Sequence, residues 1–388
     1  MTLLSRTDKS LLSDWWWTVD RSMLAAFIVL IIFGIIMVTT ASPAVAEHLN
    51  LGYYHFLIRH LVMLVPSVFM LFGMSLLTPR QIWRVSSVLL IGCFIALLLV
   101  LWTGMEIKGA KRWLHVVGFS LQPSEILKPA FAVVAAWLIA KQKENPGFRG
   151  NTYAAALYFI TISLLLLQPD LGMSVIFTMI LASQIFLAGL PFRYLFVFAG
   201  MGVAGMFAAY AGLPHVKSRI DRFLDPESGD SFQVDKSIEA IQNGGILGSG
   251  PGQGTVKLGL PDAHADFIFS VAGEELGFIF MLVIIATYGF ILIRGFRRLS
   301  QSSDMFNVLA AGGLLTMFGL QATVHMGSAM HLLPAKGMTL PFISYGGSSI
   351  LSVGLSMGIV LALTRRARKR GISRGGLSLE RNYAKNVT

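Results

Sequence analysis

Three carboxylates interrupt the segment HADFIFSVAGEELG, residues 264–277, which otherwise reads as the start of a membrane helix. They are Asp266, Glu274 and Glu275. An ionised carboxylate is costly in hydrocarbon, so each needs a partner, a route to water or a chemical role. On a helix, Asp266 and Glu274 lie about 80° apart around the axis, whereas Glu275 faces nearly the opposite way. We therefore expect Glu274 and Glu275 to form a buried pair with polar or cationic partners on neighbouring helices, and Asp266 to act as a catalytic base.

A second set of candidate residues lies in the segment KGAKRW and in the helix that follows it. Lys111 and Arg112 belong to the first, and Glu125 and Lys128 to the second. Glu125 and Lys128 are three residues apart, so they share one helix face. A simpler interpretation is that Glu125 caps the helix and pairs with Lys128, while the two preceding cations only extend to the membrane surface. We expect instead that all four line a polar cleft with Asp266 and bind substrate.

The segment LLPAKGMTLPFISYGGSS, residues 332–349, holds prolines and glycines that no continuous helix would tolerate. Irregular backbone at membrane depth is found where protein or a water-filled cavity shields it. This segment is therefore predicted to line the same cleft, where Lys336 is a further candidate for substrate binding.

Cations and carboxylates together at a lipid interface suit a lipid-linked diphosphate. Lysine and arginine would hold the diphosphate and offset its developing charge, and one carboxylate would take the proton of an attacking hydroxyl. A divalent cation, Mg or Mn, is expected to assist, with Asp266 or Glu125 as candidate ligands. The glycine-rich stretch GGILGSGPGQG lacks both a preceding strand and a Gly-Lys-Ser/Thr motif, so we expect no nucleotide cofactor.

The composition defines the elements that must position these residues. Of the 388 residues, 54% are hydrophobic and 13% charged, and the mean hydropathy is +0.67. This predicts an all-α polytopic membrane protein with about ten transmembrane helices. A single cysteine, Cys93, excludes a disulfide framework and a cysteine metal site. The predicted spans are residues 22–41, 56–77, 84–102, 123–140, 152–168, 171–189, 192–211, 266–292, 305–328 and 342–363.

Charge distribution predicts the orientation of these spans. Most of the 31 lysines and arginines fall in alternate loops and in the tails, which places both termini in the cytoplasm. The organisation is then a cytoplasmic tail (1–21), a transmembrane domain (22–363) and a basic cytoplasmic tail (364–388). One large extracytoplasmic loop, 212–265, joins the seventh and eighth spans and is expected to hold two short amphipathic helices. The RRARKR cluster directly after the last span predicts an anchor to anionic lipid and no nucleic-acid partner.

The motifs KGAKRWLHVVGFSLQPSEILK, QPDLG, GGILGSGPGQGTVKLGLPDAHADFIFSVAGEELG and LPAKGMTLPFISYGGSS closely resemble those of the SEDS family, the shape, elongation, division and sporulation proteins. The resemblance runs from about residue 20 to 365 in the same order. It implies a peptidoglycan glycosyltransferase that polymerises lipid II into β-1,4 glycan strands at the outer face of the bacterial inner membrane, releasing undecaprenyl diphosphate. It makes Asp266 the essential aspartate and assigns Arg112, Glu125 and Lys128 to the family's other polar motif positions.

Within the family, LPAKGMTLP with Lys336 is more similar to the cell-division members than to the elongation members. The resemblance therefore implies septal cell-wall synthesis with a single-pass class B penicillin-binding protein and other membrane proteins of the division machinery as partners. His325 departs from the asparagine usual in the family, and we assign it no role.

Three alternatives stay open from the sequence. The first is a lipid II flippase, for which Glu274 and Glu275 would be the natural transport residues. The second is an elongation-type polymerase. The third is a non-catalytic scaffold of the division machinery, although the tails are short for such a role.

Overall fold

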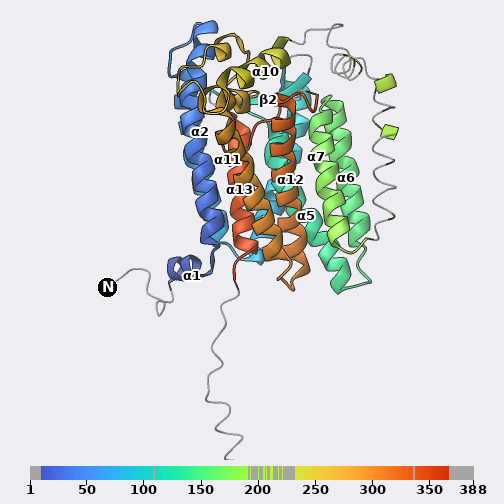
Figure 1. The fold of residues 1–388 in the computed structure, drawn as a ribbon. Helices are drawn as coiled ribbons and strands as arrows, with labels where there is room; N and C mark the ends of the chain where they lie inside the picture. Colours follow the sequence, from blue (N-terminus) through green and yellow to red (C-terminus); the bar gives the residue numbers. More distant parts are fainter. Residues whose placement is uncertain are drawn as a thin grey trace, which may run out of the picture.

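Long antiparallel helices packed side by side make up the structure (Figure 1). The computed structural model describes residues 10–107, 110–116, 118–190, 232–334 and 337–366, together with scattered residues between 193 and 221. The bundle helices are α2 (Arg21–His48), α3 (His55–Leu76), α4 (Pro79–Thr103), α5 (Pro123–Glu144), α6 (Gly150–Leu167), α7 (Leu171–Leu187), α11 (Ile268–Leu299), α12 (Met305–Ala329) and α13 (Gly347–Leu363).

These helices confirm the predicted polytopic membrane fold. Among the described residues, seven helices are long and apolar enough to cross a membrane, and α7 and α13 are shorter apolar helices of 17 residues each. Each observed bundle helix corresponds to one predicted span. The remaining predicted span, 192–211, lies mostly outside the described residues, as does the basic tail from residue 367 onwards.

The helices differ in how much of their surface is covered. In α5, 78% of the most apolar stretch is buried, compared with 22% in α6. Most residues of α12 and almost every residue of α13 are also buried. The centre of the bundle therefore consists of α5, α12 and α13, while α3, α4 and α6 expose apolar side chains on their outer faces, as expected for helices in contact with lipid.

The contact between α13 and α3 depends on small residues. A Cβ atom at Gly354 would collide with the Ser67 carbonyl, and one at Gly358 would collide with the Leu71 carbonyl. The Ser67 hydroxyl also donates a hydrogen bond of 2.5 Å to the Ile350 carbonyl. Glycine thus allows the two backbones to approach each other closely, which is a common way for membrane helices to pack.

One end of the bundle carries a short helix, α1 (Leu11–Thr18), within the segment predicted as a tail. The indole of Trp15 donates a hydrogen bond of 2.8 Å to Ser75 on α3, which fixes α1 against the bundle. Nearby, Asp20 accepts hydrogen bonds from Arg294 (2.9 Å) and Arg298 (2.7 Å) at the end of α11. Burial opposes ionisation of Asp20, but the two arginines outweigh it, so the pKa of Asp20 lies below its ordinary value.

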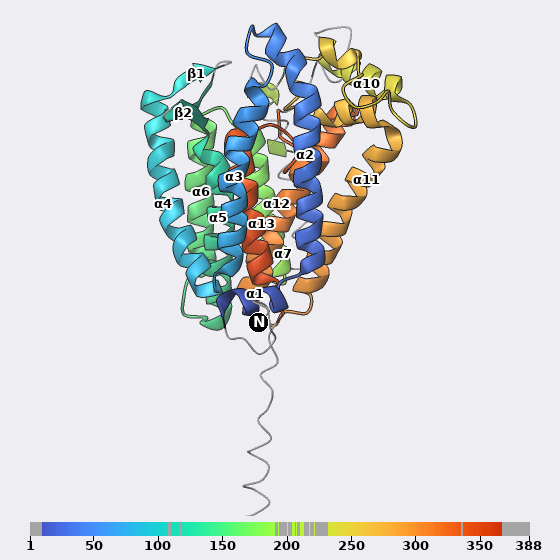
Figure 2. The same cartoon turned by 90° about the vertical axis from the view of Figure 1, so that its left-hand side faces the viewer.

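The opposite end carries the remaining elements (Figure 2). A three-stranded antiparallel sheet comprises β1 (Met105–Ile107), β2 (Ala110–Val116) and β3 (Phe119–Leu121). The sequence analysis did not predict this sheet, which pairs the backbone of the segment joining α4 to α5. Beside it lie α10 (Phe232–Gly244) and the 3-10 turn η2 (Val256–Gly259). Helix α10 is the second of the two predicted amphipathic helices, and the first lies mostly outside the described residues.

Helix α11 is not the continuous helix predicted for residues 266–292. It begins at Ile268 and is kinked at Gly277, where φ is 80° and ψ is 177°. The glycine loop, residues 243–257, wraps around this kink. Phe278 donates its N–H to Gly245 (2.9 Å), while Ser249 donates to the Glu274 carbonyl (2.9 Å). A side chain at Gly277 would collide with the backbone of Gly248, so glycine is required both for the conformation and for the close approach.

Candidate active site

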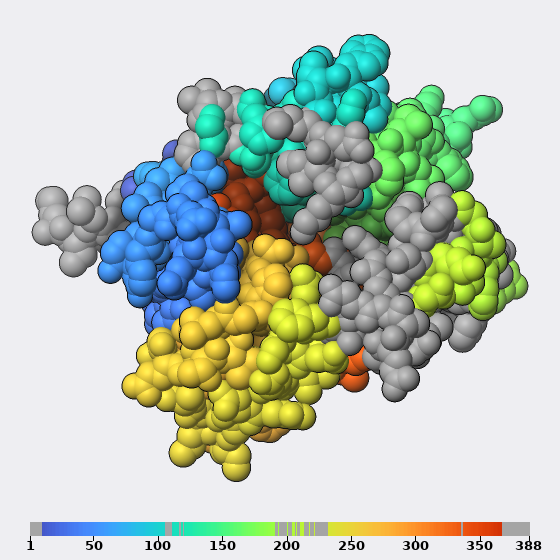
Figure 3. All heavy atoms as spheres, turned by 90° about the horizontal axis from the view of Figure 1, so that it is seen from above, coloured from blue at the N-terminus to red at the C-terminus, as the bar shows by residue number. Residues whose placement is uncertain are grey.

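A cavity of about 900 Å³ lies at the end of the bundle that carries the sheet. Figure 3 shows this end hollowed between the blue N-terminal helices, the teal sheet region and the yellow glycine loop, with the red C-terminal part of the chain inside the hollow. The wall is formed by the first turns of α3, α5, α7 and α10, together with β2, one face of α12, the turn before α11 and the broken segment before α13. Such a volume matches the size of ordinary ligand pockets.

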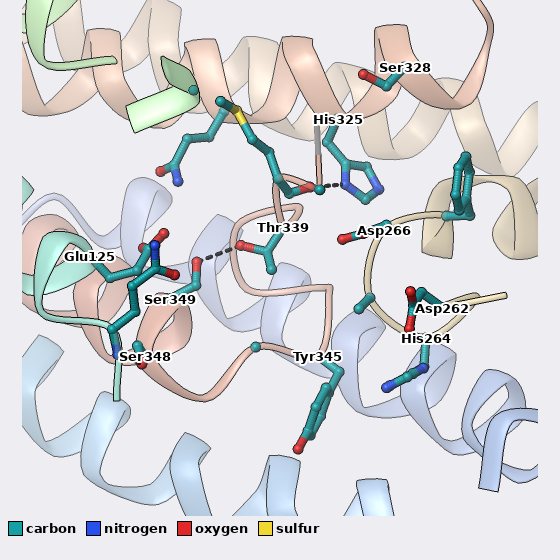
Figure 4. A pocket seen from close by; sticks show the side chains of 18 of the residues that line it. Glu125, Asp262, His264, Asp266, His325, Ser328, Thr339, Tyr345, Ser348 and Ser349 are labelled. Atoms are coloured by element: carbon teal, nitrogen blue, oxygen red, sulfur yellow. Dashed lines mark hydrogen bonds between the residues drawn. The ribbon is translucent and has the colours of Figure 1, made fainter. Parts of the chain in front are cut away.

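Asp266 lies in this wall, in the turn that precedes α11. Its carboxylate packs against Gly337 of the broken segment, with Oδ2 3.3 Å from the position that a Cβ atom would take there. Gly337 has a φ of 61°, which glycine adopts without strain. The absence of a side chain at residue 337 therefore leaves room for the carboxylate. Figure 4 shows Asp266 projecting into the cavity from the turn, opposite α12.

Glu125 reaches the cavity from the first turn of α5. Its carboxylate is 2.8 Å from the ammonium group of Lys128, which has no exposed surface and does not line the cavity. Lys128 is thus placed behind Glu125 rather than at the wall. In this arrangement it neutralises and orients a carboxylate that would otherwise be buried alone, and direct binding of substrate would require it to move.

Arg112 reaches the cavity from β2 and holds the QPDLG turn between α6 and α7. Its Nε donates to the Gln168 carbonyl (3.1 Å) and lies 3.8 Å from the Asp170 carboxylate. Asp170 also accepts a hydrogen bond of 3.3 Å from Gln122, and burial raises its pKa even though Arg112 opposes the shift. The guanidinium therefore stabilises the turn while part of it, at 30% side-chain exposure, remains open to the cavity.

The other predicted cations are placed differently. Lys111 is exposed on β2 and does not line the cavity. Lys336 lies outside the described residues. The structure brings in Arg59 of α3, which the sequence analysis did not select; it lines the cavity and donates a hydrogen bond of 3.1 Å to the Gly118 carbonyl. The sequence feature that could have indicated Arg59 as a cavity residue is its position as a basic residue on the predicted outer side of the membrane.

Serines in the first turns of α13 connect this helix to the beginning of α5. The Ser348 hydroxyl accepts the N–H of Gln122 (2.8 Å), and the Ser352 hydroxyl donates to the Glu125 carbonyl (2.6 Å). Thr339 and Ser349 share a hydrogen bond of 2.5 Å across the broken segment (Figure 4). These contacts fix the backbone that carries Glu125, a function that the Gly-Gly-Ser-Ser sequence alone did not indicate.

Three polar residues of α12 also face the cavity: Gln321, His325 and Ser328. Their spacing of four and three residues places them on one helix face. His325 Nδ1 lies 2.6 Å from the Met338 carbonyl in the broken segment. The sequence analysis assigned no role to this face, although the spacing of polar residues in an apolar helix was visible.

On the cavity side formed by α3, the ring of His264 packs between two aromatic rings. Its centroid lies 4.3 Å from that of Phe56 and 5.0 Å from that of Tyr345. Burial lowers the pKa of His264 to about 4, so the imidazole is neutral at physiological pH. The turn that carries Asp266 is thus held by aromatic packing and by the hydrogen bond from the Ser344 hydroxyl to the Ala265 carbonyl (2.7 Å).

Glu274 and Glu275 do not reach the cavity. The Glu274 carboxylate accepts N–H groups from Asn243 (3.0 Å), Val256 (2.7 Å) and Lys257 (2.9 Å). Glu275 pairs with the ammonium group of Lys257, which also donates to the Thr40 carbonyl (2.9 Å). Both glutamates are buried and partnered, as expected; Asn243 belongs to the neighbouring helix α10, whereas Val256 and Lys257 lie in the part of the glycine loop that follows it.

The carboxylates at the cavity do not form a preformed metal site. Within the described part of the chain, no group of three or more His, Cys, Asp or Glu side chains is placed to hold a metal ion. Mg²⁺ commonly binds through one or two carboxylates together with substrate phosphates. The predicted divalent cation stays a prediction, with Asp266 and Glu125 as its candidate ligands.

The family model described as "Cell cycle protein", covering FtsW, RodA and SpoVE, matches residues 20–369. The chain belongs to this family. The resemblance drawn from the motifs is therefore confirmed, and the cavity combines the family motifs that lie far apart in the sequence.

Individual members agree with this assignment. A Caulobacter vibrioides protein named "Probable peptidoglycan glycosyltransferase FtsW" is 39% identical over 363 residues, covering 93% of each chain. A Geobacter metallireducens protein of the same name is 35% identical and covers 90% of this chain and 95% of its own length. Both carry the name of the division member, in agreement with the LPAKG motif.

Two solved structures share the fold. A chain in the structure reported as "Structural coordination of polymerization and crosslinking by a peptidoglycan synthase complex" is 27% identical, with a TM-score of 0.74 over 90% of this chain and 98% of that chain. RodA from Thermus thermophilus is 27% identical, with a TM-score of 0.65 over 90% of this chain and 97% of that chain.

Proposed function

We propose that this protein is a peptidoglycan glycosyltransferase that polymerises lipid II during septal wall synthesis. The observation that carries the proposal is that one cavity collects a carboxylate, Asp266, and two guanidinium groups, Arg59 and Arg112, from separate parts of the chain. A carboxylate can accept a proton and guanidinium groups can hold a diphosphate. These are the two requirements of a glycosyl transfer from a lipid-linked diphosphate.

The reaction is a single displacement. The 4-hydroxyl oxygen of the acceptor GlcNAc attacks the anomeric carbon of the donor MurNAc, and the bond between that carbon and the diphosphate oxygen breaks. The electron pair leaves with undecaprenyl diphosphate, and the hydroxyl proton passes to Asp266. Inversion at the anomeric carbon gives the β-1,4 bond. Because the diphosphate is a good leaving group, no acid needs to protonate it.

The other cavity residues position the groups that react. Arg112 and Arg59 offset the charge that develops on the diphosphate. Glu125, held by Lys128 at 2.8 Å, supplies a fixed acceptor for sugar hydroxyls. The serines of α13 fix the backbone of Glu125, so the Glu125 carboxylate is held in place before substrate binds.

The proposed setting is the bacterial inner membrane, with both termini in the cytoplasm and the cavity at the outer surface. This orientation rests on the distribution of lysine and arginine. The proposed partner is a class B penicillin-binding protein with other division proteins, supported by the synthase complex whose chain shares this fold.

The test is polymerisation of fluorescent lipid II by the purified protein together with its cognate transpeptidase, with and without Mg²⁺ or Mn²⁺. We expect glycan strands from the wild type and none above background from Asp266→Asn. The matched control is Asp235→Asn, the same chemical change at an exposed position on α10, which should polymerise as the wild type does.

Polymer formation by Asp266→Asn would disprove the base assignment. If the wild type moves labelled lipid II across vesicles without forming polymer, the flippase alternative replaces this proposal. Glu274 and Glu275, the residues that alternative would use, are held by the glycine loop.

A further inference from the structure

His325 has an unused hydrogen-bonding atom at the wall of the cavity. The residue is 1% exposed and lines the cavity from the middle of the polar face of α12. Its Nδ1 is 2.6 Å from the Met338 carbonyl, and its Nε2 has no hydrogen-bond partner among the described residues. A buried polar atom without a partner is uncommon and costs free energy, so it calls for an explanation.

The hydrogen bond at Nδ1 fixes the state of the ring. A carbonyl oxygen only accepts, so Nδ1 must carry the proton. The described residues place no ion pair on His325, and a buried imidazole without one is favoured in the neutral form. In that form Nε2 is an acceptor. His325 thus lines the cavity with a buried imidazole lone pair that needs an N–H or O–H donor, and a small displacement of the wall would admit that donor.

The position of the ring indicates which donor. Met338, which His325 holds, directly follows Gly337, and the Asp266 carboxylate lies against Gly337. Figure 4 shows His325 and Asp266 projecting from opposite elements toward one region of the cavity. An acceptor sugar whose 4-hydroxyl reaches Asp266 carries its 3-hydroxyl on one adjacent ring carbon and its 6-hydroxyl on the CH₂OH group of the other, so these are the donors that come nearest to the imidazole.

We propose that His325 Nε2 accepts a hydrogen bond from a GlcNAc hydroxyl next to the one that Asp266 deprotonates, and so orients the acceptor sugar. The inference rests on the proposed glycosyltransferase function. It makes His325 a positioning residue with two contacts: Nδ1 holds the broken segment and Nε2 holds the substrate. Gln321 and Ser328, on the same face, continue the polar surface along which that sugar would lie.

Three substitutions separate the two contacts. In His325→Asn the side-chain amide can replace Nδ1 as donor to Met338, but no atom reaches the position of Nε2. In His325→Gln the amide reaches the position of Nε2 and cannot replace Nδ1. In His325→Leu both contacts are lost. The assay measures kcat and KM for lipid II polymerisation, and the unfolding midpoint of each variant, with wild type and Asp266→Asn in parallel.

We expect His325→Asn to lower kcat/KM about 2- to 10-fold, the value of one net hydrogen bond, with an unchanged unfolding midpoint. His325→Leu should lose more activity and also melt earlier. With lipid II whose GlcNAc lacks the 3- or the 6-hydroxyl, the wild type should lose rate on one analogue. On that analogue the asparagine variant should show no additional loss, because the contact is already absent.

A purely structural role predicts that His325→Asn retains the wild-type kcat/KM, and this result would overturn the inference. Equal penalties for the asparagine variant on intact and both deoxygenated substrates would overturn it as well. Failure of the wild type to polymerise lipid II would instead refute the proposed function, so the two failures are distinguishable.

Discussion

The turn before α11 carries Asp266, and the kinked part of α11 carries Glu274, only eight residues further on. The surroundings of these two carboxylates differ. At the kink, Glu274 is fully buried and accepts three N–H groups from the glycine loop, and Glu275 has Lys257. In the turn, Asp266 faces a cavity of about 900 Å³. At the kink the carboxylates are enclosed by their protein partners, which gives them a structural role, whereas Asp266 borders a cavity large enough for a substrate.

The sharpest test of this comparison exchanges each carboxylate for its amide. Asp266→Asn should reduce polymerisation about 10²- to 10⁴-fold because the proton acceptor is lost, and it should change the unfolding midpoint little because the amide has the same shape as the carboxylate. Glu274→Gln should show the reverse, since an amide NH₂ would face backbone N–H donors: the midpoint falls, and the folded fraction keeps activity within tenfold. The comparison fails if both variants lose activity while both keep the midpoint.

The next largest effect concerns the buried pair at the kink. Lys257→Met leaves Glu275 without a counter-charge, which should destabilise the protein by about 3–5 kcal/mol. Replacing both partners, with Lys257→Met and Glu275→Leu, should recover most of that loss. Unfolding can be followed by a thiol-reactive dye, because the one cysteine, Cys93, is buried. A double variant as unstable as the single variant would show that the charges themselves are required.

A change to the backbone conformation at the kink should have a smaller effect on the free energy of unfolding. Gly277→Ala should cost about 1–3 kcal/mol for the conformation alone, and more where the new methyl group meets Gly248. The matched control is Gly289→Ala, twelve residues further along α11, where nothing lies within 4 Å of the added atom. That change should be neutral or slightly stabilising. The measurement is the same dye-based midpoint, and equal effects at the two glycines would contradict a rigid kink.

The smallest expected effect is a pH-dependent change in stability caused by His264, in the turn before α11. The pKa of His264 is about 4 when folded, against an ordinary value of 6.5, so the unfolded chain binds a proton first as pH falls. The stability that neutral His264 contributes is complete above pH 6.5 and is lost as pH falls toward 4. His264→Gln should therefore show a shallower decline of the unfolding midpoint over this interval. Identical slopes would mean that the imidazole does not titrate differently on folding.

The sequence predicted most of the bundle because membrane helices are defined by long apolar runs, and such runs were plain for α2, α11 and α12. It also selected Asp266, Glu125 and Arg112, which the structure brings to one cavity. It did not predict the small sheet, because β1 and β3 are three residues long and have no periodicity to detect.

Partners of charged residues were the other part that the sequence could not supply. Lys128 lies behind Glu125 rather than beside the substrate, because burial depends on how α5 packs against α12 and α13. The partners of Glu274 and Glu275 come from a loop that folds back over a kink, which no local pattern encodes. His325 was passed over because the spacing of polar residues on α12 does not indicate which of their atoms remain unpaired.

The glycine seam between α3 and α13 has a consequence for how a lengthening polymer leaves the protein. Two backbones in direct contact, at Gly354 with Ser67 and at Gly358 with Leu71, have no side-chain layer to compress or rearrange. Both helices also contribute to the cavity wall, at Met63 and Gly347, and separating the seam slightly would open only an inaccessible void, so we expect this side of the cavity to stay fixed. The widening that a bulky glycan needs is then expected from the other helices of the wall.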